Sequence, residues 1–199
     1  MVTRRHLFAS ALGAVIAASS MRASVAKARL GEDGLYQFDW YVESFLDLAD
    51  DLAAATRDGK RFAILWGLRN CPACRRMHEV YMADPKVESY IRDHFAILHL
   101  NILGSREVTD FGGSLFTEKR LAAHYGIIGT PAIQFFTRQA DGLATRQPRE
   151  REVARMEALP AQDGFCQCSS RSSDSLPTGR FNREIARSRL PPRCADGLR

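Results

Sequence analysis

The fold is decided by one stretch of the chain, RFAILWGLRNCPACRRMH at residues 61–78. Its first eight residues form an apolar run, which predicts a buried strand. A short polar turn then leads to Cys71 and Pro72, and Pro72 suits the first turn of a helix because its missing N–H has no intrahelical acceptor to lose. We therefore expect a buried strand that passes, through a tight turn, into a helix starting at Cys71.

The two cysteines of this stretch lie three residues apart, so they can close a small disulfide or open to a dithiol. The free N–H groups and the positive dipole at the helix start favour a thiolate at Cys71, as do three nearby cations, Arg69, Arg75 and Arg76. Cys71 is thus the predicted nucleophile. Cys74, one turn further in and shielded from solvent, is the predicted resolving thiol. Taken alone, the motif also allows a zinc or copper site or a structural pair.

Length and composition are consistent with one ordinary domain with extensions, because the chain has 199 residues, 45% of them hydrophobic. The net charge of +5 lies at the ends: residues 1–28 carry four basic and no acidic residues, and residues 166–199 carry seven basic and three acidic ones. Residues 29–165 carry 17 basic and 20 acidic residues. No basic face interleaved with aromatic residues occurs there, so no nucleic-acid partner is expected.

The N-terminus is typical of a targeting segment. Arg4 and Arg5 precede an apolar run at residues 7–18, and small residues lead to an A-x-A-like site at 26–28. The run is too short to span a bilayer, so we expect a cleaved signal peptide over residues 1–28 and no stable membrane anchor. The letters TRRHLF at residues 3–8 resemble a twin-arginine signal, with an ordinary Sec signal as the alternative. Either route predicts a periplasmic protein, in a compartment where disulfides persist.

The rest of the chain predicts alternating helices and strands. A polar lead-in is expected over residues 29–39, an amphipathic helix with core aromatic residues over 40–57, and a helix from Pro85 capped by Asp84. Further along we expect a strand at 95–102, an insertion or small hairpin at 101–116, a helix at 117–125, and strands after Pro131 and at 152–156. His99, in the second strand, is typical of a satisfied core or edge histidine. This alternation predicts an α/β sheet with crossover helices.

A second motif, Thr130-Pro131, stands directly ahead of an apolar strand, where a turn or a cis peptide bond fits. With the strand and CPAC helix, it resembles the thioredoxin superfamily. A longer set of segments is similar to the SoxW-type periplasmic thioredoxins found with sulfur-oxidation systems: CRRMHEV at 74–80, DP at 84–85, LNI at 100–102, REVTDF at 106–111, TEK at 117–119 and FF at 135–136. The resemblance covers roughly residues 37–165 and implies a thioredoxin-like domain over 29–165, with a central mixed sheet flanked by helices.

The resemblance also implies an activity, that of a thiol:disulfide oxidoreductase acting on protein disulfides or sulfur-modified cysteines. Cys71 would attack and Cys74 resolve, and a membrane electron donor would restore the dithiol, with no organic cofactor or metal. The arginines near Cys71 favour an oxidant, but the resemblance favours a reductant, which is the direction we expect. The residues expected to contact an extended substrate are Thr130, Pro131, Pro72 and Ala73.

Three departures from the family pattern stand out. The buried carboxylate that thioredoxins place six residues before the first cysteine is replaced by Leu65, so Glu79 or a water is expected to help move the Cys74 proton. Asn70 stands where thioredoxin usually has Trp. From Cys166 the chain is rich in Ser, Arg and Pro and lacks the final amphipathic helix, so residues 166–199 are predicted to be a disordered or aberrant tail that leaves one flank of the sheet uncovered.

Several alternatives remain open on sequence alone. Cys71, Cys74 and His78 could form part of a zinc or copper site, although no fourth ligand is evident. A non-catalytic binding module with the same fold is a further alternative. A c-type haem is excluded because Arg75, not His, follows the second cysteine. The remaining cysteines, which could pair with one another but are better explained as incidental thiols, are Cys166, Cys168 and Cys194.

Overall fold

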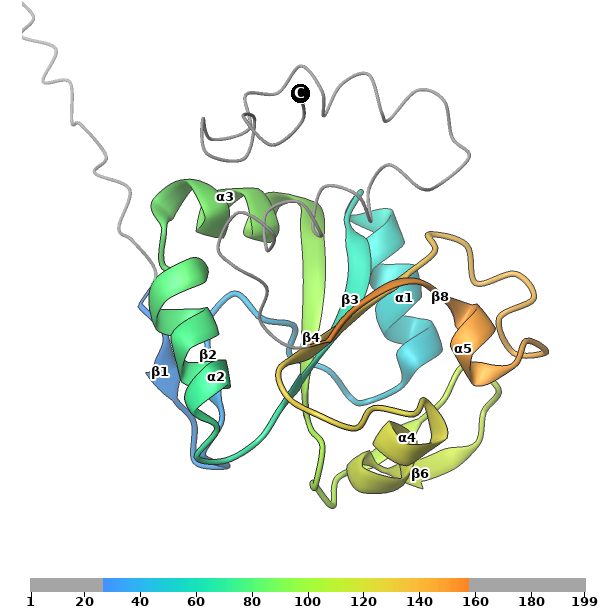
Figure 1. Cartoon of the computed structure of the whole chain (residues 1–199). Helices are drawn as coiled ribbons and strands as arrows, with labels where there is room; N and C mark the ends of the chain where they lie inside the picture. The colour runs from blue at the N-terminus through green and yellow to red at the C-terminus, as the bar shows by residue number, and fades with distance from the viewer. Residues whose placement is uncertain (1–26, 158–199) are drawn as a thin grey trace, which may run out of the picture.

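The fold is described from a computed structural model for residues 27–157 (Figure 1). Nearly all of the expected signal peptide lies outside these residues, as does the expected tail with Cys166, Cys168 and Cys194. Within the described part of the chain, no helix is both long enough and apolar enough to cross a membrane.

The centre of the molecule is a four-stranded sheet with the strand order β4-β3-β7-β8. β3 and β4 are parallel, whereas β7 runs antiparallel to both β3 and β8, so the predicted mixed sheet is confirmed. Every residue of β3 is buried, as the apolar run predicts for a central strand covered on both faces. The strands are β3 (Arg61–Gly67), β4 (Phe95–Asn101), β7 (Ala132–Phe136) and β8 (Glu152–Glu157).

Helices cover both faces of this sheet (Figure 1). Successive strand residues point to opposite faces, so Trp66 packs in one core cluster and Leu65 in the other. One cluster lies beneath α1 (Leu48–Arg57) and α4 (Glu118–His124). The other lies beneath α2 (Pro72–Arg76), the π-helical turn η1 (Met77–Tyr81) and α3 (Pro85–His94). A short helix, α5 (Pro148–Arg151), leads into β8.

The N-terminal segment differs from the expected lead-in. It forms a hairpin of β1 (Arg29–Leu30) and β2 (Tyr36–Gln37), which lies beside α2 in Figure 1. Turn chemistry explains the difference, because the Asp33 carboxylate accepts the Leu35 N–H at 3.0 Å and Gly34 has a φ of 77°. Leu35 is buried, which ties the hairpin to the domain.

The first helix also differs from the expectation, because it begins at Leu48 rather than at residue 40. Asp47 caps it by accepting two backbone N–H groups, and Leu46, with a φ of 64°, breaks the helical path just before the cap. The expected core role of the aromatic residues is wrong for Phe45, which is fully exposed, whereas Trp40 is half-buried.

The later elements follow the sequence pattern closely. Asp84 caps α3 through the N–H groups of the second and third helical residues, and Thr117 caps α4. The insertion is a hairpin of β5 (Glu107–Thr109) and β6 (Leu115–Thr117). Polar residues with the right turn and cap chemistry therefore predicted these boundaries correctly.

Candidate active site

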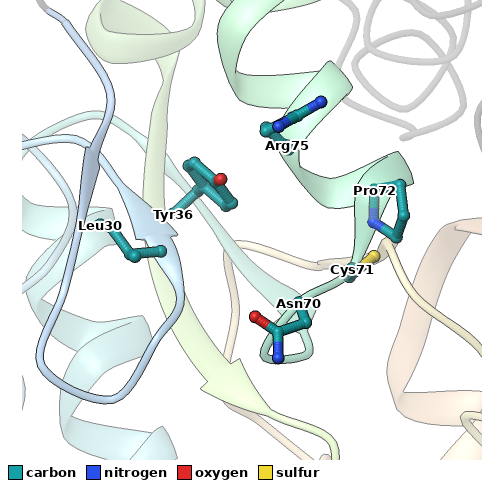
Figure 2. A pocket seen from close by; sticks show the side chains of 6 residues that line it. All are labelled: Leu30, Tyr36, Asn70, Cys71, Pro72 and Arg75. Carbon is teal, nitrogen blue, oxygen red and sulfur yellow. The ribbon is translucent and has the colours of Figure 1, made fainter.

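The two cysteines of the CPAC motif lie at the start of α2, directly after β3. Cys71 is the N-cap residue and Pro72 is the first helical residue. The Cys74 N–H donates to Cys71 Sγ at 3.0 Å, and the two cysteines are joined by a disulfide, with their Cα atoms 5.2 Å apart. Cys71 lines a surface pocket, whereas Cys74 is 2% exposed (Figure 2). Cys71 therefore lies at the pocket, and Cys74 lies behind it.

Asn70 makes the turn from β3 into the cysteine helix. Its φ of 57° lies in the left-handed region, which costs most residues about 1 to 2 kcal/mol but which Asn adopts more readily. The backbone conformation therefore favours Asn at the position before Cys71.

The Thr130-Pro131 motif faces Cys71 across the site. The peptide bond between these two residues is cis. The Thr130 hydroxyl donates to Cys71 Sγ at 3.4 Å, and the Thr130 carbonyl oxygen lies 3.7 Å from the same sulfur. Two segments about sixty residues apart in sequence are thus brought together, as the resemblance implied.

An exposed apolar side chain precedes this loop and was not identified from sequence. Ile128 is 90% exposed, two residues before Thr130. Nothing in the sequence pattern separates it from the buried Ile127 beside it. Its position makes it a candidate substrate contact, together with Pro72, which is exposed, and Ala73, which is half-buried.

A pocket of about 270 Å³ opens in front of Cys71 (Figure 2). One wall comes from the N-terminal hairpin, and the other from the active-site turn and α2. Arg69 holds the two walls together, because its Nε donates to the Asp33 carbonyl at 3.3 Å and its side chain lies against Gly34. The residues that line the pocket are Leu30, Tyr36, Asn70, Cys71, Pro72 and Arg75.

The three arginines expected near Cys71 have different positions. Arg75 lines the pocket, and its Nε lies 3.7 Å from the Glu79 carboxylate. Arg76 lies over the ring of Tyr81, 5.8 Å from its centroid, while Arg69 is directed to the hairpin. The described groups aimed at the Cys71 sulfur are therefore a backbone N–H and a hydroxyl, with one exposed guanidinium at the rim.

Leu65 stands where the family has a buried carboxylate, and its apolar side chain is fully buried. Of the two substitutes expected from sequence, Glu79 or a water, Glu79 does not fit the geometry, because its side chain is 52% exposed and paired with Arg75 in solvent. The polar groups buried on the same side of the sheet include two histidines and a tyrosine that contact one another, His78, His99 and Tyr41.

His78 lies on η1, one turn after Cys74, and is fully buried. Its Nδ1 is 2.8 Å from the Cys74 carbonyl oxygen, and its Nε2 is 2.9 Å from the Tyr41 hydroxyl. A carbonyl only accepts, so Nδ1 carries the proton and Nε2 accepts from Tyr41. Burial lowers the pKa of His78 to about 4, so the ring is neutral at pH 7.

The hydrogen bonds of His78 argue against its serving as a metal ligand together with Cys71 and Cys74. Both nitrogens of His78 are occupied, so His78 offers no lone pair toward the sulfurs of Cys71 and Cys74. Among residues 27–157, no group of three metal-binding side chains is close enough to hold an ion. The cysteine pair therefore lacks, within the described chain, the third ligand that the sequence suggested.

His99 lies on β4, in register with Leu65 of β3. It is buried as expected, but the expectation of a satisfied histidine is wrong, because neither ring nitrogen has a hydrogen-bond partner among the described residues. Its ring centroid lies 5.7 Å from that of His78 and 5.6 Å from that of Tyr41. Burial lowers the pKa of His99 well below its ordinary value, and the neighbouring His78 and the Arg106 guanidinium lower it further.

Comparison with known proteins places this geometry in context. A family model described as a thioredoxin-like domain matches residues 48–156. Similar solved structures include a thioredoxin from Thermus thermophilus, with 18% identity, a TM-score of 0.47, and coverage of 72% of this chain and 94% of that one. A thioredoxin-fold protein from Helicobacter pylori has 15% identity, a TM-score of 0.42, and coverage of 70% and 90%.

A third similar structure is described as DsbH oxidoreductase, with 15% identity, a TM-score of 0.44, and coverage of 65% of this chain and 83% of that one. No curated protein matches the chain.

Proposed function

The chain belongs to the thioredoxin-like domain family, and from that premise we propose that it is a thiol:disulfide oxidoreductase. One observation carries the proposal: a CPAC disulfide at a helix start faces the Thr130-Pro131 loop, whose hydroxyl lies 3.4 Å from the Cys71 sulfur. A sulfur with free donors around it, a second thiol within bonding reach and an open pocket are what thiol–disulfide exchange needs.

The exchange proceeds in two steps. The Cys71 thiolate attacks one sulfur of a substrate disulfide, so that bond breaks and a mixed disulfide forms, while the other substrate sulfur leaves as a thiolate. The Cys74 thiolate then attacks Cys71 Sγ, which closes the CPAC disulfide and releases the second substrate thiolate. The substrate gains two electrons and the protein loses two.

Substrate contacts are proposed on two sides of Cys71. An extended segment would pair its backbone with the Thr130-Pro131 loop and pack an apolar side chain on Ile128, which is exposed beside it. The neighbouring residue of the substrate would enter the pocket between the hairpin and Arg75. Main-chain pairing gives affinity with little demand on sequence, so we expect a range of protein substrates.

The direction and setting of the reaction are part of the same proposal. We favour reduction of protein disulfides or sulfur-modified cysteines outside the cytoplasm, with a membrane electron donor that restores the dithiol. The signal-like residues 1–28 support export, and the resemblance of residues 74–136 to SoxW-type thioredoxins supports both a reducing role and a link to sulfur oxidation.

The activity is tested on the full chain with its other cysteines, Cys166, Cys168 and Cys194, replaced by serine. We expect reduction of a disulfide-bonded peptide in the presence of dithiothreitol. Cys71→Ser should abolish it, and Cys74→Ser should stop at a mixed disulfide that mass spectrometry detects. Undiminished turnover by the Cys71→Ser variant would overturn the proposal.

The proposed export is tested separately by fusing residues 1–28 to a reporter enzyme that is active only outside the cytoplasm. We expect active reporter. Loss of that activity on replacing Arg4 and Arg5 by lysine would identify the twin-arginine route, since Sec signals tolerate this change. An inactive reporter with both arginines present would contradict export.

A further inference from the structure

The second step of the exchange needs a group that accepts the proton of the Cys74 thiol. Cys74 must lose this proton before it can attack Cys71, yet it is 2% exposed and has Leu65 where the family has a carboxylate. Glu79 is turned to solvent and paired with Arg75. A thiol buried in apolar surroundings is difficult to ionise, so a proton acceptor on this side of the sheet would speed the second step.

His99 lies on the side of the sheet that α2 covers. Phe95 and Ile97 alternate with it along β4, and both pack in the cluster that contains Leu65. Its Nε2 is pressed against Gly67, so closely that a Cβ there would overlap with the ring. Gly67 is the last residue of β3, and the active-site turn begins directly after it. The imidazole therefore lies next to Leu65, at the base of the active-site turn.

The ring of His99 is unsatisfied. Both nitrogens are buried and neither has a hydrogen-bond partner in the described chain, which costs stability that a leucine of similar size would not. Unsatisfied buried polar groups of this kind are uncommon in folded proteins. His99 lies beside His78, whose Nδ1 donates to the Cys74 carbonyl, so a free basic nitrogen in this place has a chemical use.

His78 and Tyr41 determine which histidine is available. His78 donates its Nδ1–H to the Cys74 carbonyl and accepts the Tyr41 hydroxyl at Nε2, so it has no free nitrogen. It instead holds the backbone of Cys74 in place. Its ring centroid lies 5.7 Å from that of His99, between the cysteine helix and β4. His78 and Tyr41 are thus positioning residues, and of the two histidines only His99 has a ring nitrogen with an unoccupied lone pair.

We propose that His99 takes up the proton of the Cys74 thiol as Cys74 attacks the mixed disulfide, in the place of the missing carboxylate. The inference rests on the proposed exchange reaction. In this step the proton moves from Cys74 Sγ to a ring nitrogen of His99, and the Cys74 Sγ–Cys71 Sγ bond forms. The bond from Cys71 to the substrate sulfur breaks, the substrate leaves as a thiolate, and the imidazolium then returns its proton to solvent.

The surroundings of His99 make this transfer transient. Burial, the neighbouring His78 and the Arg106 guanidinium, whose Nη2 donates to the His99 carbonyl at 3.1 Å, all disfavour the imidazolium. The other titratable groups nearby are Tyr41, against both rings, and Tyr36, 6.2 Å from the ring centroid of His78. His99 is therefore neutral at pH 7, with its lone pair available, and it gives the proton up once the disulfide has closed.

The test separates the two steps of exchange in the full chain with Cys166, Cys168 and Cys194 replaced by serine. Attack is timed by stopped flow in a Cys74→Ser background, and resolution is timed, in proteins that keep Cys74, as release of the second substrate thiol. For His99→Leu and His99→Gln we expect attack within twofold of the parent and resolution roughly ten to a hundred times slower at pH 7. The deficit should shrink as the pH rises above about 8.5, the ordinary pKa of a thiol, because a growing share of Cys74 is then ionised without a proton acceptor.

A stability measurement and a control variant distinguish a loss of proton transfer from a loss of folding. His99→Leu should unfold at the same or a higher urea concentration than the parent, because it removes an unsatisfied group. His124→Gln, on α4 and stacked on Phe116, should leave both steps unchanged. If His99→Leu resolves at the parental rate across pH 6 to 9, the role of His99 is overturned but the exchange reaction is not. Failure of the Cys74→Ser protein to form any mixed disulfide would overturn the exchange reaction and this role together.

Discussion

The sulfur of Cys71 is the atom on which the account depends, and three neighbours define its surroundings. The Cys74 N–H lies 3.0 Å away and the Thr130 hydroxyl 3.4 Å away, and Arg75 lies at the rim of the pocket. Hydrogen bonds to a charged acceptor are stronger than those to a neutral one, so both donors favour the thiolate. An exposed arginine adds little because solvent screens it.

Asn70 allows a direct test of the active-site turn. Its left-handed φ predicts that Asn70→Ala lowers the free energy of unfolding by about 1 kcal/mol, whereas Asn70→Gly leaves it nearly unchanged. Urea unfolding of the two variants measures this. Equal stabilities for the alanine and glycine variants would contradict the assigned backbone conformation.

His78 predicts how stability depends on pH. Its pKa is about 4 in the folded protein against about 6.5 when unfolded, so between these values the unfolded chain binds more protons. The stability present above pH 6.5 is therefore lost as the pH falls to 4, by about 3 kcal/mol from this residue, and His99 acts in the same direction.

Urea unfolding at pH 7 and pH 4 checks this, with His78→Gln as the comparison. The parent should lose about 3 kcal/mol more than the variant between the two pH values, because only the parent must charge the imidazole on unfolding. A parallel loss in both proteins would assign the acid sensitivity to other groups.

Single residues also show what the sequence could and could not reveal. Spacing and residue type alone were enough to predict four residues of the site, which the structure brings together: Cys71, Cys74, Thr130 and Pro131. The sequence gives no such indication for His99, because a histidine in an apolar strand cannot be distinguished from an ordinary core histidine. Its unpaired nitrogens become visible only when the strand is placed beside its neighbours.

At the scale of elements, the N-terminal hairpin changes the shape of the site. It precedes the residues matched by the family model, yet Leu30 and Tyr36 form one wall of the pocket beside Cys71. Arg69, in the active-site turn, donates a hydrogen bond to the Asp33 carbonyl of the hairpin. We therefore propose the hairpin as a second substrate surface, in addition to the Thr130-Pro131 loop.

The hairpin wall can be tested with substrates of two sizes. Tyr36→Ala should raise KM several-fold for a disulfide-bonded peptide while leaving the rate with a small aromatic disulfide within twofold, because only the peptide reaches the wall. Leu115→Ser, which alters an exposed apolar residue on the other hairpin, should change neither. Equal loss on both substrates would mean that Tyr36 acts on Cys71 itself.

Elements also show why the sequence-based boundaries failed where they did. The helix expected from residue 40 begins at Leu48, because a cap at Asp47 and a left-handed Leu46 outweigh apolar spacing upstream. The hairpin at 29–37 was missed because its strands have two residues each, too few to show alternation. Longer elements such as β3 and β4 were predictable, since burial on both faces makes them continuously apolar.

At the scale of the molecule, a buried polar network ties distant parts of the chain together. Arg151 of α5 pairs with Asp110, which follows β5, and Asp110 also accepts the Tyr125 hydroxyl at 2.7 Å. Both charged side chains are nearly inaccessible to solvent. The network joins the second hairpin, the end of α4 and the approach to β8 on the face away from the cysteines.

Breaking this network should destabilise the fold without altering the chemistry. Asp110→Ala leaves the Arg151 charge buried and unpaired, so we expect a loss of about 3 to 5 kcal/mol in the free energy of unfolding. The exchange rate of the folded fraction should be unchanged. The exposed Asp141→Ala serves as the control and should cost less than about 0.5 kcal/mol. A cost that small for Asp110→Ala as well would contradict the role of the network.

The central claim is that Cys71 and Cys74 form a reversible redox pair, and a redox titration tests it most directly. The full chain with its other three cysteines replaced by serine is equilibrated with glutathione and dithiothreitol buffers, and its metal content is recorded on the same sample. We predict one two-electron transition between about −270 and −120 mV, toward the reducing end, with no bound metal. A pair that does not oxidise, or that carries stoichiometric zinc or copper, would contradict the account.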